Sequence, residues 1–147
     1  MNRNLSDYQE QYSNQPYEKY QVSFRKMKLI ELLNKYNHQN ILEVGCGIGL
    51  SSLILNRLNA DITATDYHPE AEKFLDINTE LNKDDEIPFV RTCWSNEYQE
   101  ELGKFDLIIG SDLLYERDHA ILLSNFIQIL PKTCCIFLAR NWFIKLR

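Results

Sequence analysis

Three glycines, Gly45, Gly47 and Gly49, lie at alternate positions in the stretch ILEVGCGIGLSSLIL at residues 41–55, where an apolar run gives way to a helical pattern. Glycine destabilises both strands and helices. Three together therefore indicate a backbone that bends sharply and stays bare so that a ligand can approach it. The alternative is a simple tight turn, which rarely needs three glycines. The glycine pattern therefore predicts a ligand-binding loop at residues 45–49.

The glycine spacing and a nearby acid narrow the class of ligand. Leu50 stands where the dinucleotide fingerprint G-x-G-x-x-G places its third glycine, and no Gly-Lys-Ser/Thr of a phosphate-binding loop follows. Glu43 precedes the loop in a strand expected to be buried, where a carboxylate is costly without a partner. It would repel a phosphate and favour a cation, as in S-adenosylmethionine. The alternative is that Glu43 interacts only with the helix dipole of the loop.

ILEVGCGIG resembles motif I of the class I S-adenosylmethionine-dependent methyltransferases, a seven-stranded relative of the Rossmann fold, and DITATDYHPEA is similar to the segment that follows it. By this resemblance Asp66 accepts hydrogen bonds from the ribose hydroxyls, and Tyr67 lies by the adenine. The other expected cofactor residues in this part of the chain are Glu43, Gly45, Cys46, Gly47 and Gly49. Two alternatives stay open: Asp66 as the N-cap of the next helix, and Cys46 as small filler.

A second resemblance comes from FDLIIGSDLLYERDH at residues 105–119. It is similar to the D-x-x-Y motif of family 16 type methyltransferases, which include protein-lysine methyltransferases. This implies that Asp112 and Tyr115 are catalytic and shape the acceptor pocket, beside Ser111 in the cofactor site. Trp94 in TCWSN corresponds to the region that grips adenine, although Cys93 stands where the family often has an acid. A turn role for Asp112 and packing roles for Tyr115 and Trp94 are the alternatives.

Hydrophobic periodicity and turn signals predict the elements that position these residues. Helices are expected at residues 22–36, 51–58, 68–81 and 118–130, and strands at residues 41–44, 60–66, 87–91, 104–112 and 134–139. Their alternation predicts an α/β fold: a Rossmann-like parallel sheet of the class I methyltransferase type with helices on both faces. Ligands bind such sheets at the carboxyl ends of the strands.

The resemblance implies two further strands after the fifth, but the sequence ends at FLARNWFIKLR. We therefore expect about five strands, a truncated C-terminus, and an exposed apolar edge that a homo-oligomer covers. The expected organisation is a helical or lid segment at residues 1–38 and an S-adenosylmethionine-binding domain at residues 39–147.

Composition bounds the remaining function classes. The 147 residues are 44% hydrophobic, which suits one globular unit, and the net charge of −5 argues against a nucleic-acid backbone as partner. No apolar run approaches the roughly 18 residues that span a bilayer, and no secretory signal is recognisable, so a cytoplasmic protein is expected. Scattered cysteines and histidines predict no metal site.

Two functions from different classes follow. The first is S-adenosylmethionine-dependent methyl transfer to a nitrogen acceptor, a protein lysine or a small molecule. Here Asp112 or Tyr115 receives the amine proton or orients the amine. The alternative is a truncated, non-catalytic S-adenosylmethionine-binding module or remnant. A dehydrogenase is a distant third.

Overall fold

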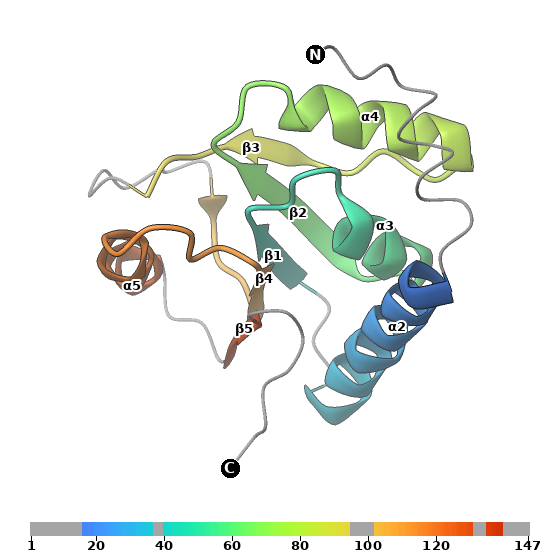
Figure 1. Ribbon diagram of the computed structural model, residues 1–147, viewed down its shortest axis with the longest axis horizontal. Helices are drawn as coiled ribbons and strands as arrows, with labels where there is room; N and C mark the ends of the chain where they lie inside the picture. Colours follow the sequence, from blue (N-terminus) through green and yellow to red (C-terminus); the bar gives the residue numbers. More distant parts are fainter. Residues whose placement is uncertain (1–15, 37–39, 95–101, 131–134, 140–147) are drawn as a thin grey trace.

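Five parallel strands form the sheet in the computed structural model, which describes residues 16–36, 40–94, 102–130 and 135–139 (Figure 1). The strands are β1 (Asn40–Val44), β2 (Asp61–Asp66), β3 (Phe89–Arg91), β4 (Leu107–Ser111) and β5 (Cys135–Ala139). The helices are α2 (Pro16–Tyr36), α3 (Leu50–Arg57), α4 (Ala71–Asn82) and α5 (His119–Ile129). The predicted α/β class and the alternation of elements are confirmed. Residues 140–147, the tail after the fifth strand on which the expectation of a truncated C-terminus depended, lie outside the described residues.

The strand order β3-β2-β1-β4-β5 makes β1 the point where the chain changes direction across the sheet. Val44, the last residue of β1, pairs with Thr65 of β2 on one side and with Gly110 of β4 on the other. The carboxyl ends of these three strands therefore meet at one edge. Such a reversal opens a crevice in which α/β sheets bind ligands.

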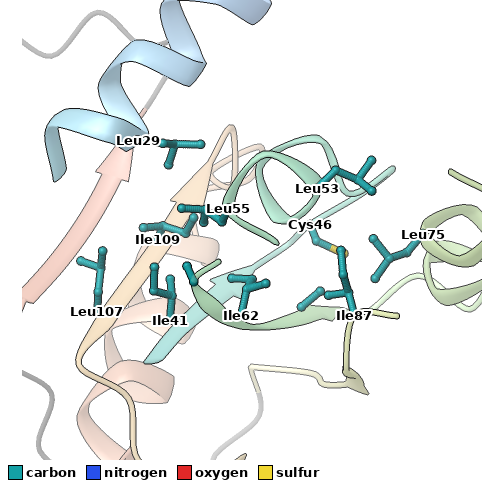
Figure 2. Close-up of a cluster of buried hydrophobic side chains, with 12 residues drawn as sticks. Leu29, Ile41, Cys46, Leu53, Leu55, Ile62, Leu75, Ile87, Leu107 and Ile109 are labelled. Carbon is teal, nitrogen blue, oxygen red and sulfur yellow. The ribbon is translucent and has the colours of Figure 1, made fainter. Parts of the chain in front are cut away.

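Helices cover both faces of the sheet. Successive residues of β1 point to opposite faces, so β1 contributes apolar side chains to the packing on each side. Ile41 packs in a cluster with residues of α2, α3 and α4, namely Leu29, Leu53, Leu55 and Leu75 (Figure 2). Leu42 and Val44 pack on the other face in a cluster that includes Leu123 and Phe126 of α5. α2 through α4 thus form one layer and α5 the other (Figure 1).

The glycine loop after β1 is held by close packing as well as by its backbone conformation. Gly49 has φ +83°, and a Cβ added to it would come 2.3 Å from Cδ1 of Leu75 on α4. Gly49 also starts α3, and its carbonyl accepts a hydrogen bond from the Leu53 N–H at 2.9 Å. Glycine is favoured here because a side chain would strain the left-handed backbone and force the Leu75 side chain to move.

We expect Gly49→Ala to lower the free energy of unfolding by about 2–3 kcal/mol, the sum of left-handed strain and a clash with Leu75. Gly103→Ala is the matched control, because Gly103 has φ +48° but nothing lies within 4 Å of its added Cβ. The control should lose only about 1 kcal/mol. Urea unfolding of both variants measures the difference, and equal losses would contradict the packing argument.

Candidate active site

A cavity of about 440 Å³ opens at the carboxyl ends of β1, β2 and β4. Its wall combines glycines, acids, aromatic residues, leucines and small polar residues from both halves of the sheet: Gly45, Gly47, Asp66, Tyr67, Cys93, Trp94, Ser111, Asp112, Leu113, Tyr115, His119 and Leu122. The tertiary structure therefore brings most of the expected cofactor residues into one cavity with the two expected catalytic residues.

Asp66 holds the glycine loop against the end of β2. One carboxylate oxygen accepts a hydrogen bond from the Gly47 N–H at 2.8 Å, and the other accepts one from the His68 N–H at 2.8 Å. Helix α4 begins five residues later, with Glu70 at its N-cap position, so Asp66 is not the N-cap that was one alternative. Each oxygen keeps a second lone pair for a ligand donor.

Gly47 differs from the other two loop glycines because it is exposed, and a Cβ added to it would meet nothing within 4 Å. The space in front of it belongs to the cavity. Of the three glycines, only Gly47 both lines the cavity and presents open space where a side chain would stand. Gly47 is therefore the loop residue at which a ligand can approach the backbone without meeting a side chain.

Aromatic side chains flank the cavity near Asp66. Tyr67 is exposed, and the Arg91 guanidinium lies 5.9 Å from its ring centroid while Arg91 Nε donates to the Tyr67 carbonyl at 3.2 Å. Trp94 meets the His119 ring edge to face, with centroids 5.6 Å apart and planes at 86°. Flat surfaces and an acid at one end of the cavity suit an aromatic ring joined to a hydroxyl-bearing sugar.

The D-x-x-Y segment forms a further part of the cavity wall. Asp112 has φ +54°, a left-handed conformation that a residue other than glycine rarely adopts. This turn sends the Leu113 side chain into a gap between β1 and β4, where it would clash with a Cβ on Gly45 at 2.4 Å or on Gly110 at 2.5 Å. Tyr115 is 79% exposed at the cavity mouth. The packing of Leu113 thereby anchors Asp112 and Tyr115.

Glu43 lies outside the cavity lining, buried between the sheet and α3. Ser52 donates a hydrogen bond to its carboxylate. Burial raises the pKa of this carboxyl, while hydrogen bonds from Ser52 and Ser51 and the charge of Arg25 oppose the rise. Burial likewise lowers the pKa of Arg25, and the charges of Glu43 and Asp112 counteract it. Glu43 therefore ties α3 and α2 to the end of β1.

Cys46 and Gly49 also lie outside the lining. The Cys46 side chain is buried in the same cluster as Leu75 and Ile87 (Figure 2). Burial, with the nearby charges of Glu43 and Asp66, raises the pKa of its thiol, so the group stays protonated and unreactive. This packing agrees with the filler alternative. Cys46 and Gly49 can therefore affect cofactor binding by shaping the loop backbone, not through side-chain contacts with the ligand.

Sequence reasoning missed four lining residues: Cys93, Leu113, His119 and Leu122. His119 carried the clearest signal, because it follows Tyr115 by four residues and lies in the first turn of the helix predicted at residues 118–130. Its contact with Trp94 joins segments 25 positions apart, which no local pattern reveals.

No group of three His, Cys, Asp or Glu residues in the described part of the chain is arranged to hold a metal ion. Among the helices that the structure describes, none combines the length and apolarity needed to cross a membrane.

A family model described as lysine methyltransferase matches residues 11–141, most of the chain. The chain belongs to the lysine methyltransferase family. It is 29% identical over 110 residues to protein N-lysine methyltransferase METTL21A of Xenopus tropicalis, covering 69% of this chain and 49% of that protein. It is 31% identical over 91 residues to the electron transfer flavoprotein beta subunit lysine methyltransferase of Rattus norvegicus, covering 61% and 34%. The chain thus spans less than half the length of these relatives.

Solved structures of methyltransferases share the fold. Magnesium protoporphyrin IX methyltransferase of Synechocystis PCC 6803 superposes with a TM-score of 0.60 at 19% identity, covering 75% of this chain and 52% of that one. This likeness confirms the predicted Rossmann-like sheet of the methyltransferase type.

The buried acid of this lysine methyltransferase family member gives a prediction for stability. The folded-state pKa of Glu43 lies above its ordinary value of 4.5. Folding therefore takes up a proton between these two values, and the stability that Glu43 contributes falls as the pH rises through that window. Glu43→Gln keeps an oxygen for Ser52 without the charge. We expect the variant to be more stable than the wild type at neutral pH, with the difference shrinking toward pH 4.5.

Urea unfolding across this pH range measures the effect. Glu72→Gln on the exposed side of α4 is the control, and its stability difference should not follow the same pH course. If the wild type instead loses stability relative to Glu43→Gln as the pH falls, the raised pKa of Glu43 is contradicted.

Proposed function

We propose that the protein is an S-adenosylmethionine-dependent methyltransferase that transfers a methyl group to a nitrogen acceptor, with a protein lysine as the favoured acceptor. The observation that carries the proposal is that Asp66, Trp94, Asp112 and Tyr115 line one and the same cavity. Family membership supports it, as do the relatives whose names specify lysine methylation.

The residues of the cavity fit S-adenosylmethionine. Its volume of about 440 Å³ lies within the range of small-molecule sites. The open space at Gly47 admits a ligand close to the backbone, and the free lone pairs of Asp66 can accept from ribose hydroxyls. Tyr67 and Trp94 offer aromatic surface for a base. Together these features fit an adenosyl group better than a phosphate-bearing cofactor, because the carboxylates of Asp66 and Asp112 in the wall would repel a phosphate.

S-adenosylmethionine, when bound, supplies a methyl group on a positively charged sulfur. The chain must then hold the acceptor nitrogen in line with that group and remove the proton of an ammonium acceptor. The Asp112 carboxylate is suited to attract the ammonium group and accept its proton. Tyr115, three residues later, is suited to orient the amine through its hydroxyl.

Helix α2 is the described part of the expected lid segment at residues 1–38; residues 1–15, 37 and 38 lie outside the described residues. On α2, Leu29 packs in the sheet cluster, and Arg25 lies one turn before it. The charge of Arg25 interacts with Glu43 and Asp112. We propose that α2 contributes to closing the Asp112 end of the cavity. A homo-oligomer over the β5 edge and a cytoplasmic location stay predictions.

Two measurements test the function. Calorimetry with S-adenosylhomocysteine measures cofactor binding, and release of S-adenosylhomocysteine from S-adenosylmethionine in the presence of candidate lysine peptides or proteins measures transfer. Binding with product formation supports the enzyme. Binding without product for every acceptor favours the non-catalytic module, and no binding overturns the proposal.

Asp112→Asn should lower the rate of transfer at least about 100-fold, the usual contribution of a positioned proton acceptor. Asparagine tolerates the left-handed backbone of Asp112, so the affinity for S-adenosylhomocysteine should change by less than about twofold. Asp118→Asn is the matched control, since Asp118 is an exposed acid of the same segment outside the cavity lining. Parallel loss of binding and transfer in Asp112→Asn would argue against the catalytic role.

A further inference from the structure

We propose that His119 recognises the exocyclic amino group of the adenine, with its ring nitrogen Nε2 accepting the hydrogen bond. This inference rests on the proposed function and makes His119 a residue that selects the base of the cofactor. The His119 ring lines the cavity, is oriented by a hydrogen bond to the D-x-x-Y segment and lies beside the Trp94 ring.

The ring of His119 lies in the cavity wall between Trp94 and the D-x-x-Y segment. His119 is the first residue of α5, whereas Trp94 follows β3, and the two rings meet edge to face at 5.6 Å. Both side chains line the same cavity. The His119 side chain is 28% exposed, so it is accessible to a ligand without being free to leave the wall.

A hydrogen bond determines which ring nitrogen is available. His119 Nδ1 lies 3.2 Å from the carbonyl oxygen of Leu113. A carbonyl oxygen only accepts, so Nδ1 carries the hydrogen and donates it, and in the neutral ring Nε2 is left as an acceptor. Because the Leu113 side chain is packed against Gly45 and Gly110, the carbonyl and the ring it orients have a fixed position.

An acceptor at this place selects a ligand that presents an N–H group. The Glu116 carboxylate, whose side chain is 78% exposed, lies 3.9 Å from Nε2 and forms an ion pair with the ring when the ring is protonated. In the neutral ring this separation is too long for a hydrogen bond, so Nε2 can accept one from a ligand. Cys93, next to Trp94, contributes a thiol, which is a weak hydrogen-bonding group. A purine with a 6-amino group satisfies Nε2, whereas a 6-oxo purine would set its oxygen against the Nε2 lone pair.

The test compares two ligands by calorimetry: S-adenosylhomocysteine and S-inosylhomocysteine, in which an oxo group replaces the 6-amino group. The wild type should prefer the adenosyl ligand by at least about fivefold, the value of one neutral hydrogen bond. In His119→Phe, which keeps an aromatic edge beside Trp94 but has no Nε2, the preference should fall about fivefold. His119→Gln, whose amide oxygen can accept, should retain part of it.

The ratio of the two affinities separates recognition from structural support. Leu122→Ala is the matched control, because it alters an apolar part of the same wall. The affinity for both ligands should fall equally, so the ratio of the two affinities should stay unchanged. Equal weakening of both ligands in His119→Phe would overturn the inference by showing a structural role. An unchanged ratio with slower methyl transfer would also overturn it, because Nε2 would then serve the acceptor amine. Failure of the wild type to bind S-adenosylhomocysteine would instead overturn the proposed function itself.

Discussion

At the carboxyl ends of β1 and β4, the Leu113 side chain occupies the space that Cβ atoms on Gly45 and Gly110 would fill. This contact joins the two strands between which the chain reverses direction, and it anchors the segment that carries Asp112 and Tyr115. The left-handed backbone of Asp112 directs Leu113 into the gap. The strain of that conformation is therefore offset by apolar packing, and the cavity wall keeps its shape.

The polar groups around the cavity are already oriented by the chain itself. Asp66 binds the N–H groups of Gly47 and His68, Arg91 holds Tyr67, and the Leu113 carbonyl orients His119. A ligand that enters such a wall finds its partners in place, so little conformational entropy is lost on binding. The same hydrogen bonds hold the glycine loop to β2, which makes the cofactor site and the fold parts of one network.

Buried charge links the outer helices to this network. Glu43 is only 3% exposed, accepts a hydrogen bond from Ser52 of α3 and interacts with the charge of Arg25 from α2. A carboxylate in this position is costly unless several groups compensate it. The N-terminal helix is therefore coupled to the centre of the sheet by electrostatics as well as by Leu29, close to the end of the cavity where Asp112 lies.

The amino-acid sequence was sufficient to predict the order of the elements, the parallel sheet and the strand ends at which the site forms, because hydrophobic period, glycine spacing and acid positions are local properties. It singled out Gly47, Asp66, Trp94, Asp112 and Tyr115, all of which line the cavity. The three-dimensional fold was needed to show that Glu43 and Cys46 face the packed layer of α3 and α4, and that His119 meets Trp94. Those outcomes depend on which face of β1 each side chain takes and on contacts between segments distant in the chain, and neither is encoded in spacing alone.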